Sequence, residues 1–303
     1  MGLFLQLLIR GIIAGSLYAL LGVSWGIIYN TTRTFHFAHG FIYTLASYMI
    51  LLFVGLSLPL IPSVVMGLLV ATAVGCAVEF FGYLPMRNRN ASQLSIFLTA
   101  IGIMIAGQSL ISLVFGPDSR PLRGLPEGII TVDAMPPYPK IRFRETVSTT
   151  IDMLTVFVAW IFIVLLFFLL ARTKVGMMIR AVSSNPEKAI FIGIDSRKVF
   201  VLVFAIGSLL VSVASFLATL DEPANPNIGI HALLVAFIAV FLGGVGNLRG
   251  TVIGGLILGI SESLSIIILP TDYKTIVSSL ILFLVILVKP EGLMGQRRPA
   301  MGH

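Results

Sequence analysis

The residues best spaced for metal chemistry are two histidines, His36 and His39, which lie three positions apart and would share one helix face. No third ligand lies near them in the sequence, so we predict no metal site and interpret both as polar residues lining a break at a membrane edge. The chain contains no His-Glu-x-x-His, Cys-x-x-Cys or Gly-x-x-x-x-Gly-Lys-Ser/Thr pattern. We therefore expect no cofactor, no P-loop nucleotide site and no enzymatic activity.

Three charged residues, Arg10, Glu79 and Glu262, interrupt long apolar runs. A charge inside a membrane is costly and marks a candidate functional position. Glu262 lies in the middle of its run, so it is the acid that a proton-coupled carrier would use. Glu79 lies toward the end of its run.

Two short polar segments precede apolar helices, Phe35-His-Phe-Ala-His-Gly40 and Gly243-Gly-Val-Gly-Asn-Leu-Arg-Gly250. A helix that begins at membrane depth presents unpaired N–H groups and a positive dipole end, and such ends commonly face a translocated solute. The alternative is that the glycines only allow close packing. We favour the functional interpretation for the glycine-rich segment and weigh the two equally for the other. The predicted route residues are Phe37, His39, Gly40, Gly243, Gly244, Gly246, Asn247, Gly250 and Glu262.

The composition identifies the class of protein that must position these residues. Of 303 residues, 57% are hydrophobic and 11% are charged, against roughly 25% charged in a soluble domain. A spanning helix needs about 20 apolar residues, so the apolar content suits eight or nine membrane segments. The sequence predicts an all-α, polytopic transmembrane bundle with discontinuous helices.

The hydropathy pattern divides the chain into nine apolar segments within one domain, 1–303. One or two of them are candidates for re-entrant rather than spanning segments. The polar segment 116–150 is predicted to be one long extracytoplasmic loop, and 172–198 a shorter, basic cytoplasmic one. The predicted apolar segments are 3–29, 35–54, 60–84, 93–115, 151–170, 199–220 and three pieces of 232–288.

The net charge of +7 is best explained by membrane orientation rather than by nucleic acid, because the cations lie between apolar runs. Placing the carboxyl terminus in the cytoplasm puts thirteen of the twenty Lys and Arg residues on that side and six outside, with Arg10 inside the first span. The thirteen are Arg33, Arg87, Arg89, Arg172, Lys174, Arg180, Lys188, Arg197, Lys198, Arg249, Lys289, Arg297 and Arg298; the six are Arg120, Arg123, Lys140, Arg142, Arg144 and Lys274.

The basic loop contains a helix-start signal, Ser184-Asn-Pro-Glu187. It fits a capping box, or Asn185 as N-cap with Pro186 in the first turn. The predicted helix is one to two turns long, ends at Gly193 and exposes Ile190 and Phe191. Such a helix either lies on lipid or docks a soluble subunit.

Four ordered motifs resemble the LivH-type permeases of branched-chain amino acid ABC importers, over essentially the whole chain. They are Phe37-Ala-His-Gly40 with Tyr43 and Ala46-Ser-Tyr48; the glycine-rich segment with Glu262; Val175-Gly-Met-Met-Ile-Arg-Ala-Val with Asn185-Pro-Glu-Lys-Ala189 and Gly193-Ile194; and Val288-Lys-Pro-Glu-Gly-Leu-Met-Gly295. One departure is His36, where the family usually has Asn. Relatives of this type also carry urea, short amides and other amino acids.

The resemblance implies a permease subunit in a prokaryotic plasma membrane, without an ATPase of its own. Its partners would be a second, LivM-like permease chain, two ATP-binding subunits and an extracytoplasmic solute-binding protein. It also implies two related halves, each with one broken helix. The ATPase-coupling residues would be Asn185, Pro186, Glu187, Ala189 and Gly193.

Two rival functions remain open at this point. A stand-alone proton-coupled carrier would transport without ATPases and would depend on Glu262. A passive channel for a small neutral solute would conduct in both directions and would not depend on 185–193.

Overall fold

The computed structural model describes residues 2–122, 141–143, 146–148, 150–270, 273–289 and 291–295. Most of the predicted loop 116–150 lies outside these residues. So do five of the cations counted for orientation, Arg123, Lys140, Arg144, Arg297 and Arg298.

The described residues form a helical bundle, as the composition predicts, with one small antiparallel hairpin. The helices are α1 (Gly2–Thr32), α2 (His39–Gly55), α3 (Leu60–Ala77), the π-helix η1 (Val78–Tyr83), α4 (Leu84–Asn88), α5 (Gln93–Phe115), α6 (Thr150–Arg172), α7 (Lys174–Ser184), α8 (Pro186–Phe191), α9 (Ser196–Thr219), α10 (Ile228–Gly243), α11 (Leu248–Ser265) and α12 (Lys274–Val288); the strands are β1 (Ile141–Phe143) and β2 (Thr146–Ser148).

The nine predicted apolar segments correspond to nine apolar helices among the described residues. Five candidate spans are long and apolar enough to cross a membrane, and α10 and α11 form one further candidate that is bent by 118° at its break. Two shorter apolar helices, α2 and most of α12, complete the set. The chain is therefore a multi-pass membrane protein.

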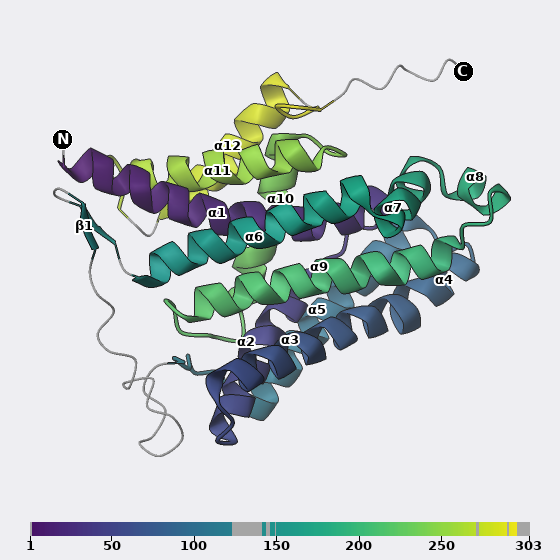
Figure 1. Ribbon diagram of the computed structural model, residues 1–303, viewed down its shortest axis with the longest axis horizontal. Helices are drawn as coiled ribbons and strands as arrows, with labels where there is room; N and C mark the ends of the chain where they lie inside the picture. Colours follow the sequence, from purple (N-terminus) through teal and green to yellow (C-terminus); the bar gives the residue numbers. More distant parts are fainter. Residues whose placement is uncertain are drawn as a thin grey trace.

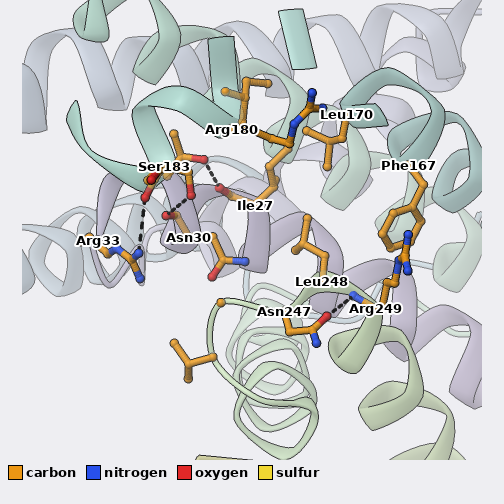
Figure 2. A pocket seen from close by; sticks show the side chains of 15 residues that line it. Ile27, Asn30, Arg33, Phe167, Leu170, Arg180, Ser183, Asn247, Leu248 and Arg249 are labelled. Carbon is orange, nitrogen blue, oxygen red and sulfur yellow. Dashed lines mark hydrogen bonds between the residues drawn. The ribbon is translucent and has the colours of Figure 1, made fainter. Parts of the chain in front are cut away.

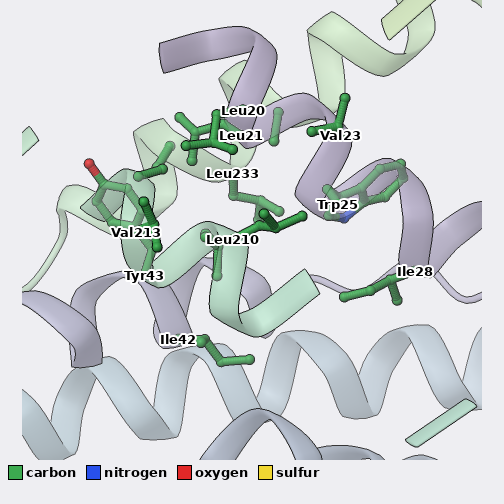
Figure 3. Packing of buried hydrophobic residues seen from close by; sticks show 14 of the residues in the cluster. Leu20, Leu21, Val23, Trp25, Ile28, Ile42, Tyr43, Leu210, Val213 and Leu233 are labelled. Atoms are coloured by element: carbon green, nitrogen blue, oxygen red, sulfur yellow. The ribbon is translucent and has the colours of Figure 1, made fainter. Parts of the chain in front are cut away.

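Helix α1 is the centre of the bundle. It packs against α6, α9, α10 and α11, and Figure 1 shows α1, α6 and α9 running side by side, with α10 crossing their direction. Tightly packed side chains from four helices fill the space around α1, including Trp25, Ile42, Leu210 and Leu233, as Figure 3 shows. Each of these four side chains is buried.

Small residues let α1 and α11 approach backbone to backbone. A Cβ on Gly11 would lie 2.7 Å from Cα of Ile260, and one on Gly15 would lie 2.9 Å from Cα of Leu256. Gly255 of α11 meets α1 in the same way. Helix association between apolar surfaces depends on such close packing, because lipid is as apolar as the side chains it replaces.

Helix α7 is an element that the sequence analysis did not predict. It is strongly amphipathic, with Gly176, Ile179 and Val182 buried on one face. The Thr173 side chain caps its first turn. The helical spacing of Val175, Ile179 and Val182 is typical of an amphipathic helix. The polar composition of 172–198 obscured this pattern. The hairpin β1–β2 and the π-helix η1 were also not predicted.

Candidate functional site

The first predicted break lies between α1 and α2, where residues 33–38 are not helical. Helix α1 ends at Thr32, and Arg33 has a φ of 57°, which turns the chain. The indole nitrogen of Trp25 donates to the carbonyl of His36 at 3.3 Å. The backbone N–H groups of His39 and Gly40 bond to the carbonyls of His36 and Phe37 at 3.3 and 3.2 Å. The first two N–H groups of α2 are therefore bonded to the turn that precedes the helix.

Both histidines of this break are buried, and each is hydrogen-bonded within the chain through one of its two ring nitrogens. Nδ1 of His36 lies 3.0 Å from the hydroxyl of Tyr83, and Nε2 of His39 lies 2.9 Å from the hydroxyl of Ser24. The π-helix η1 carries Tyr83. Among the described residues no group of three or more His, Cys, Asp or Glu is placed to hold a metal.

Glu79, the acid predicted toward the end of its run, forms an ion pair with Arg87. Nη2 of Arg87 is 3.0 Å from the Glu79 carboxylate and also donates to Thr34 at 3.2 Å. The guanidinium lies 4.7 Å from the ring centroid of Phe200. A buried carboxylate needs such pairing, and the pair anchors the first break to η1 and α9.

The second predicted break, between α10 and α11, is closed by backbone contact. Gly243 and Gly250 touch so closely that a Cβ on either would collide with the carbonyl of the other. The Asn247 side chain caps α11, accepting from the N–H groups of Arg249 and Gly250 at 3.1 Å each. These helix-end N–H groups are thus satisfied by the cap and not left open.

The carboxyl-terminal segment 291–295 folds over this break. The N–H groups of Leu293 and Met294 donate to the carbonyls of Leu242 and Gly243 at 2.9 and 3.0 Å. The Asn247 amide donates to the Met294 carbonyl at 3.0 Å. This segment closes over Gly244, a residue with a positive φ of 109°.

A cavity of about 740 Å³, here named the Arg249 cavity, adjoins the second break. Figure 2 shows its wall, with Arg33, Arg180 and Arg249 around it. Of the predicted route residues, Gly246 and Asn247 line this cavity. Gly246 has a φ of 95° and open space where a Cβ would stand.

The Arg249 cavity is basic, because three arginines and no Asp or Glu are among the residues that line it. The side chain of Asn30 lines it, and the Oδ1 atom is buried without a hydrogen-bond partner. A buried, unpartnered oxygen is rare and favours a site that takes up water or a ligand.

The predicted short helix of the basic loop is present as α8 (Pro186–Phe191). Asn185 caps it by accepting from the N–H of Lys188 at 2.9 Å, and Gly193 ends it with a φ of 82°. Both features were predicted. Glu187 is exposed, whereas Ala189 is buried, with 2% of its surface accessible.

The outward face of α8 and the turn after it is apolar. Ile190, Phe191 and Ile192 are 62%, 89% and 71% exposed. The sequence analysis predicted exposure of the first two, and the structure confirms it. Exposed apolar side chains grouped in this way mark an interaction surface.

Hydrogen bonds connect α8 to the membrane helices. Ser196 at the start of α9 donates to the carbonyl of Pro186 at 3.1 Å. Through α7, Ser183 donates to the carbonyl of Asn30 on α1 at 2.8 Å. A displacement of α8 would therefore reach the helix end that precedes the first break.

Glu262 is buried at 4% exposure and holds three helices together. The hydroxyl of Tyr18 on α1 donates to its Oε2 at 2.7 Å, and Ser278 on α12 donates to its Oε1. It also lines a second cavity, of about 450 Å³, here named the Arg10 cavity.

The two cavities lie at opposite ends of the same helices. On α1 the Arg10 cavity is lined by residues 10–21 and the Arg249 cavity by residues 27–31. On α6 the corresponding residues are 151–155 and 167–170. Phe37, His39 and Gly40 line neither cavity, and Gly243, Gly244 and Gly250 also do not.

The comparisons with known proteins agree with this architecture. The model of the family described as "Branched-chain amino acid transport system / permease component" matches residues 7–286. The high-affinity branched-chain amino acid transport system permease protein LivH of Escherichia coli K12 is 33% identical, covering 97% of this chain and 96% of that protein. The corresponding protein BraD of Pseudomonas aeruginosa is 29% identical with the same coverage.

A solved structure shows the same fold. It is PsaBC from Streptococcus pneumoniae in complex with Fab, with a TM-score of 0.53 at 13% identity. The match covers 95% of this chain and 92% of that chain.

Proposed function

The chain belongs to the family of branched-chain amino acid transport permease components, and from that membership we propose that it is the membrane-spanning subunit of an ATP-driven importer for branched-chain or other hydrophobic amino acids. The observation that carries the proposal is the pair of cavities at opposite ends of α1 and α6, with a docking surface beside one of them. A permease that gives a solute access to each side of the membrane in turn needs an opening toward each side, and the two cavities supply one candidate opening at each end.

The docking surface formed by Ile190, Phe191 and Ile192 receives one of two ATP-binding subunits, which supply the ATPase activity that this chain lacks. Motion of α8 passes to α9 through Ser196 and to α1 through Ser183. Asn185, Pro186 and Gly193 shape α8, Glu187 contributes an exposed charge, and Ala189 packs its inner face. This assignment places 172–198, and with it the carboxyl terminus, in the cytoplasm of a prokaryotic cell.

The remaining partners are a second, LivM-like permease chain and a binding protein that delivers solute at the Arg10 end. Within the single permease domain, Gly246 and Asn247 border the route at the cytoplasmic end. Phe37, His39, Gly40, Gly243, Gly244 and Gly250 keep the broken helices packed beside it, a role supported by their buried or close-packed positions.

We propose the solute class for which the relatives are named, the branched-chain amino acids. The residue that departs from the family pattern, His36, lies away from the cavities. It is completely buried and bonded to Tyr83. A urea or amide permease of the same type is the alternative.

The proposal is tested by uptake of labelled leucine into vesicles that contain the reconstituted complex, with alanine and urea as competitors. We expect uptake that requires ATP and the binding protein, with competition by aliphatic amino acids and none by urea. A vesicle preparation with the permease chains alone serves as the control. Uptake by that preparation would favour a carrier or a channel, and competition by urea would select the amide permease.

A further inference from the structure

We propose that the Arg10 cavity is a binding site for a zwitterionic amino acid with an aliphatic side chain, occupied during transfer from the binding protein to the route. The inference rests on the proposed function and goes further by naming the groups in this chain that recognise the solute. Three features of the lining carry it: one cation, a group of acids on other elements, and an apolar wall.

The cation is Arg10, which α1 presents to the cavity from inside the first candidate span. Its side chain is exposed and contributes to the lining of the cavity. A guanidinium inside a membrane segment is costly and calls for a functional reason. Guanidinium groups bind carboxylates through two parallel hydrogen bonds, which matches the α-carboxylate of an amino acid.

The acids come from elements other than α1. Asp221 and Glu222 follow the end of α9, and both are exposed; Asp152 begins α6. Asp152 and Glu262 already interact with other groups. Asp221 and Glu222 still outnumber Arg10, so the cavity attracts a cation while retaining one site for an anion. An α-ammonium group beside an α-carboxylate satisfies both requirements, whereas urea or a simple amide satisfies neither.

The apolar part of the lining would contact the aliphatic side chain of the solute. Leu17, Leu217 and Val235 contribute it from three different helices. An apolar wall discriminates by only about 1–3 kcal/mol per methylene. The cavity would therefore accept aliphatic amino acids broadly and leave the finer choice among them to the binding protein.

Glu262 is a structural member of the lining rather than a ligand. Both of its carboxylate oxygens already accept hydrogen bonds, from Tyr18 and Ser278. It fixes α1 against α11 and α12 and thereby keeps the wall that carries Arg10 in place.

One hydrogen bond joins α1 to α6 beside the Arg10 cavity. The indole N–H of Trp160 on α6 donates to the hydroxyl of Ser16 on α1 at 3.1 Å. Ser16 is next to Leu17 of the Arg10 cavity, while Trp160 lines an apolar groove that shares Phe167 and Arg249 with the Arg249 cavity.

The test uses the complete transporter with its binding protein and compares Arg10→Gln, Arg10→Lys and Glu222→Gln. Two quantities are measured at saturating leucine-loaded binding protein: uptake of labelled leucine, and ATP hydrolysis stimulated by that protein. Asp118→Asn is the matched control, because Asp118 is an exposed acid after α5 that lies outside the cavity.

Removing either charge should lower uptake about tenfold or more, the usual cost of a lost charge-assisted hydrogen bond. Stimulated ATP hydrolysis should persist, and Arg10→Lys should recover part of the uptake. Asp118→Asn should behave as the wild type.

Unchanged uptake in Arg10→Gln and Glu222→Gln would overturn the binding site while leaving the importer intact. Loss of stimulated hydrolysis together with uptake would also overturn it, because the two residues would then dock the binding protein. If the wild-type complex itself shows no ATP-dependent uptake, the failure belongs to the proposed function.

Discussion

Gly40 and Gly229 touch where the start of α2 meets the start of α10: a Cβ placed on Gly40 would lie 2.6 Å from the carbonyl oxygen of Gly229. The hydroxyl of Thr44 receives the N–H of Gly229 at 3.2 Å one turn further on. Two helices that begin far apart in the sequence are thus joined at the first break.

Gly40→Ala should destabilise the folded protein by about 1–3 kcal/mol, because the added methyl meets backbone that cannot move aside. Thermal unfolding in detergent measures the effect. Gly102→Ala is the matched control, since Gly102 is also helical but nothing lies within 4 Å of the position that its Cβ would take. This variant should be at least as stable as the wild type. Equal stability of both variants would mean that α2 and α10 can separate without cost.

Gly246→Leu and Gly243→Ala should fail in different ways. At Gly246 the added side chain enters the Arg249 cavity, at a strain of about 1–2 kcal/mol from the positive φ. We expect the complex to assemble but transport to fall. At Gly243 even one methyl collides with Gly250, so assembly itself should be lost. Co-purification of the subunits and leucine uptake separate the two, and full transport by Gly246→Leu would show that this glycine serves only the turn.

Glu262→Gln and Tyr18→Phe should each lower the thermal stability, by about 1.5–3 kcal/mol for a charge-assisted hydrogen bond. Because the two side chains share one bond, the double variant should lose less than the sum of the single losses. Uptake by Glu262→Gln should still depend on ATP. If the chain were a proton-coupled carrier, Glu262→Gln would instead keep the stability of the wild type and lose transport.

Phe191→Ser should release the ATP-binding subunits while the membrane helices stay folded, because it removes the most exposed apolar side chain of α8. Co-purification with the ATP-binding subunits measures attachment. Phe81→Ser is the control, an exposed phenylalanine on η1 that lies outside the docking surface. Normal attachment of the ATP-binding subunits to Phe191→Ser would count against docking at α8. A large residue at Ala189 is a poorer probe, because that side chain is buried and its enlargement would deform α8.

Local sequence signals were enough to predict the class of protein, the apolar segments and the cap of α8. Those features depend on local signals: an apolar run long enough for a membrane, or Asn185 followed by a proline. For the same reason both breaks were predictable, since small polar residues before an apolar helix are visible in one stretch of chain.

The roles of the residues at the breaks depend on how the helices pack in three dimensions. Gly243 and Gly246 lie in the same glycine-rich segment, and the sequence does not distinguish their roles. In the structure Gly243 touches the backbone of α11, whereas Gly246 lines the Arg249 cavity. The partner of Glu262 is Tyr18, on the first helix. Such pairings depend on which helices become neighbours, and that is set by packing across the whole bundle rather than by any local pattern.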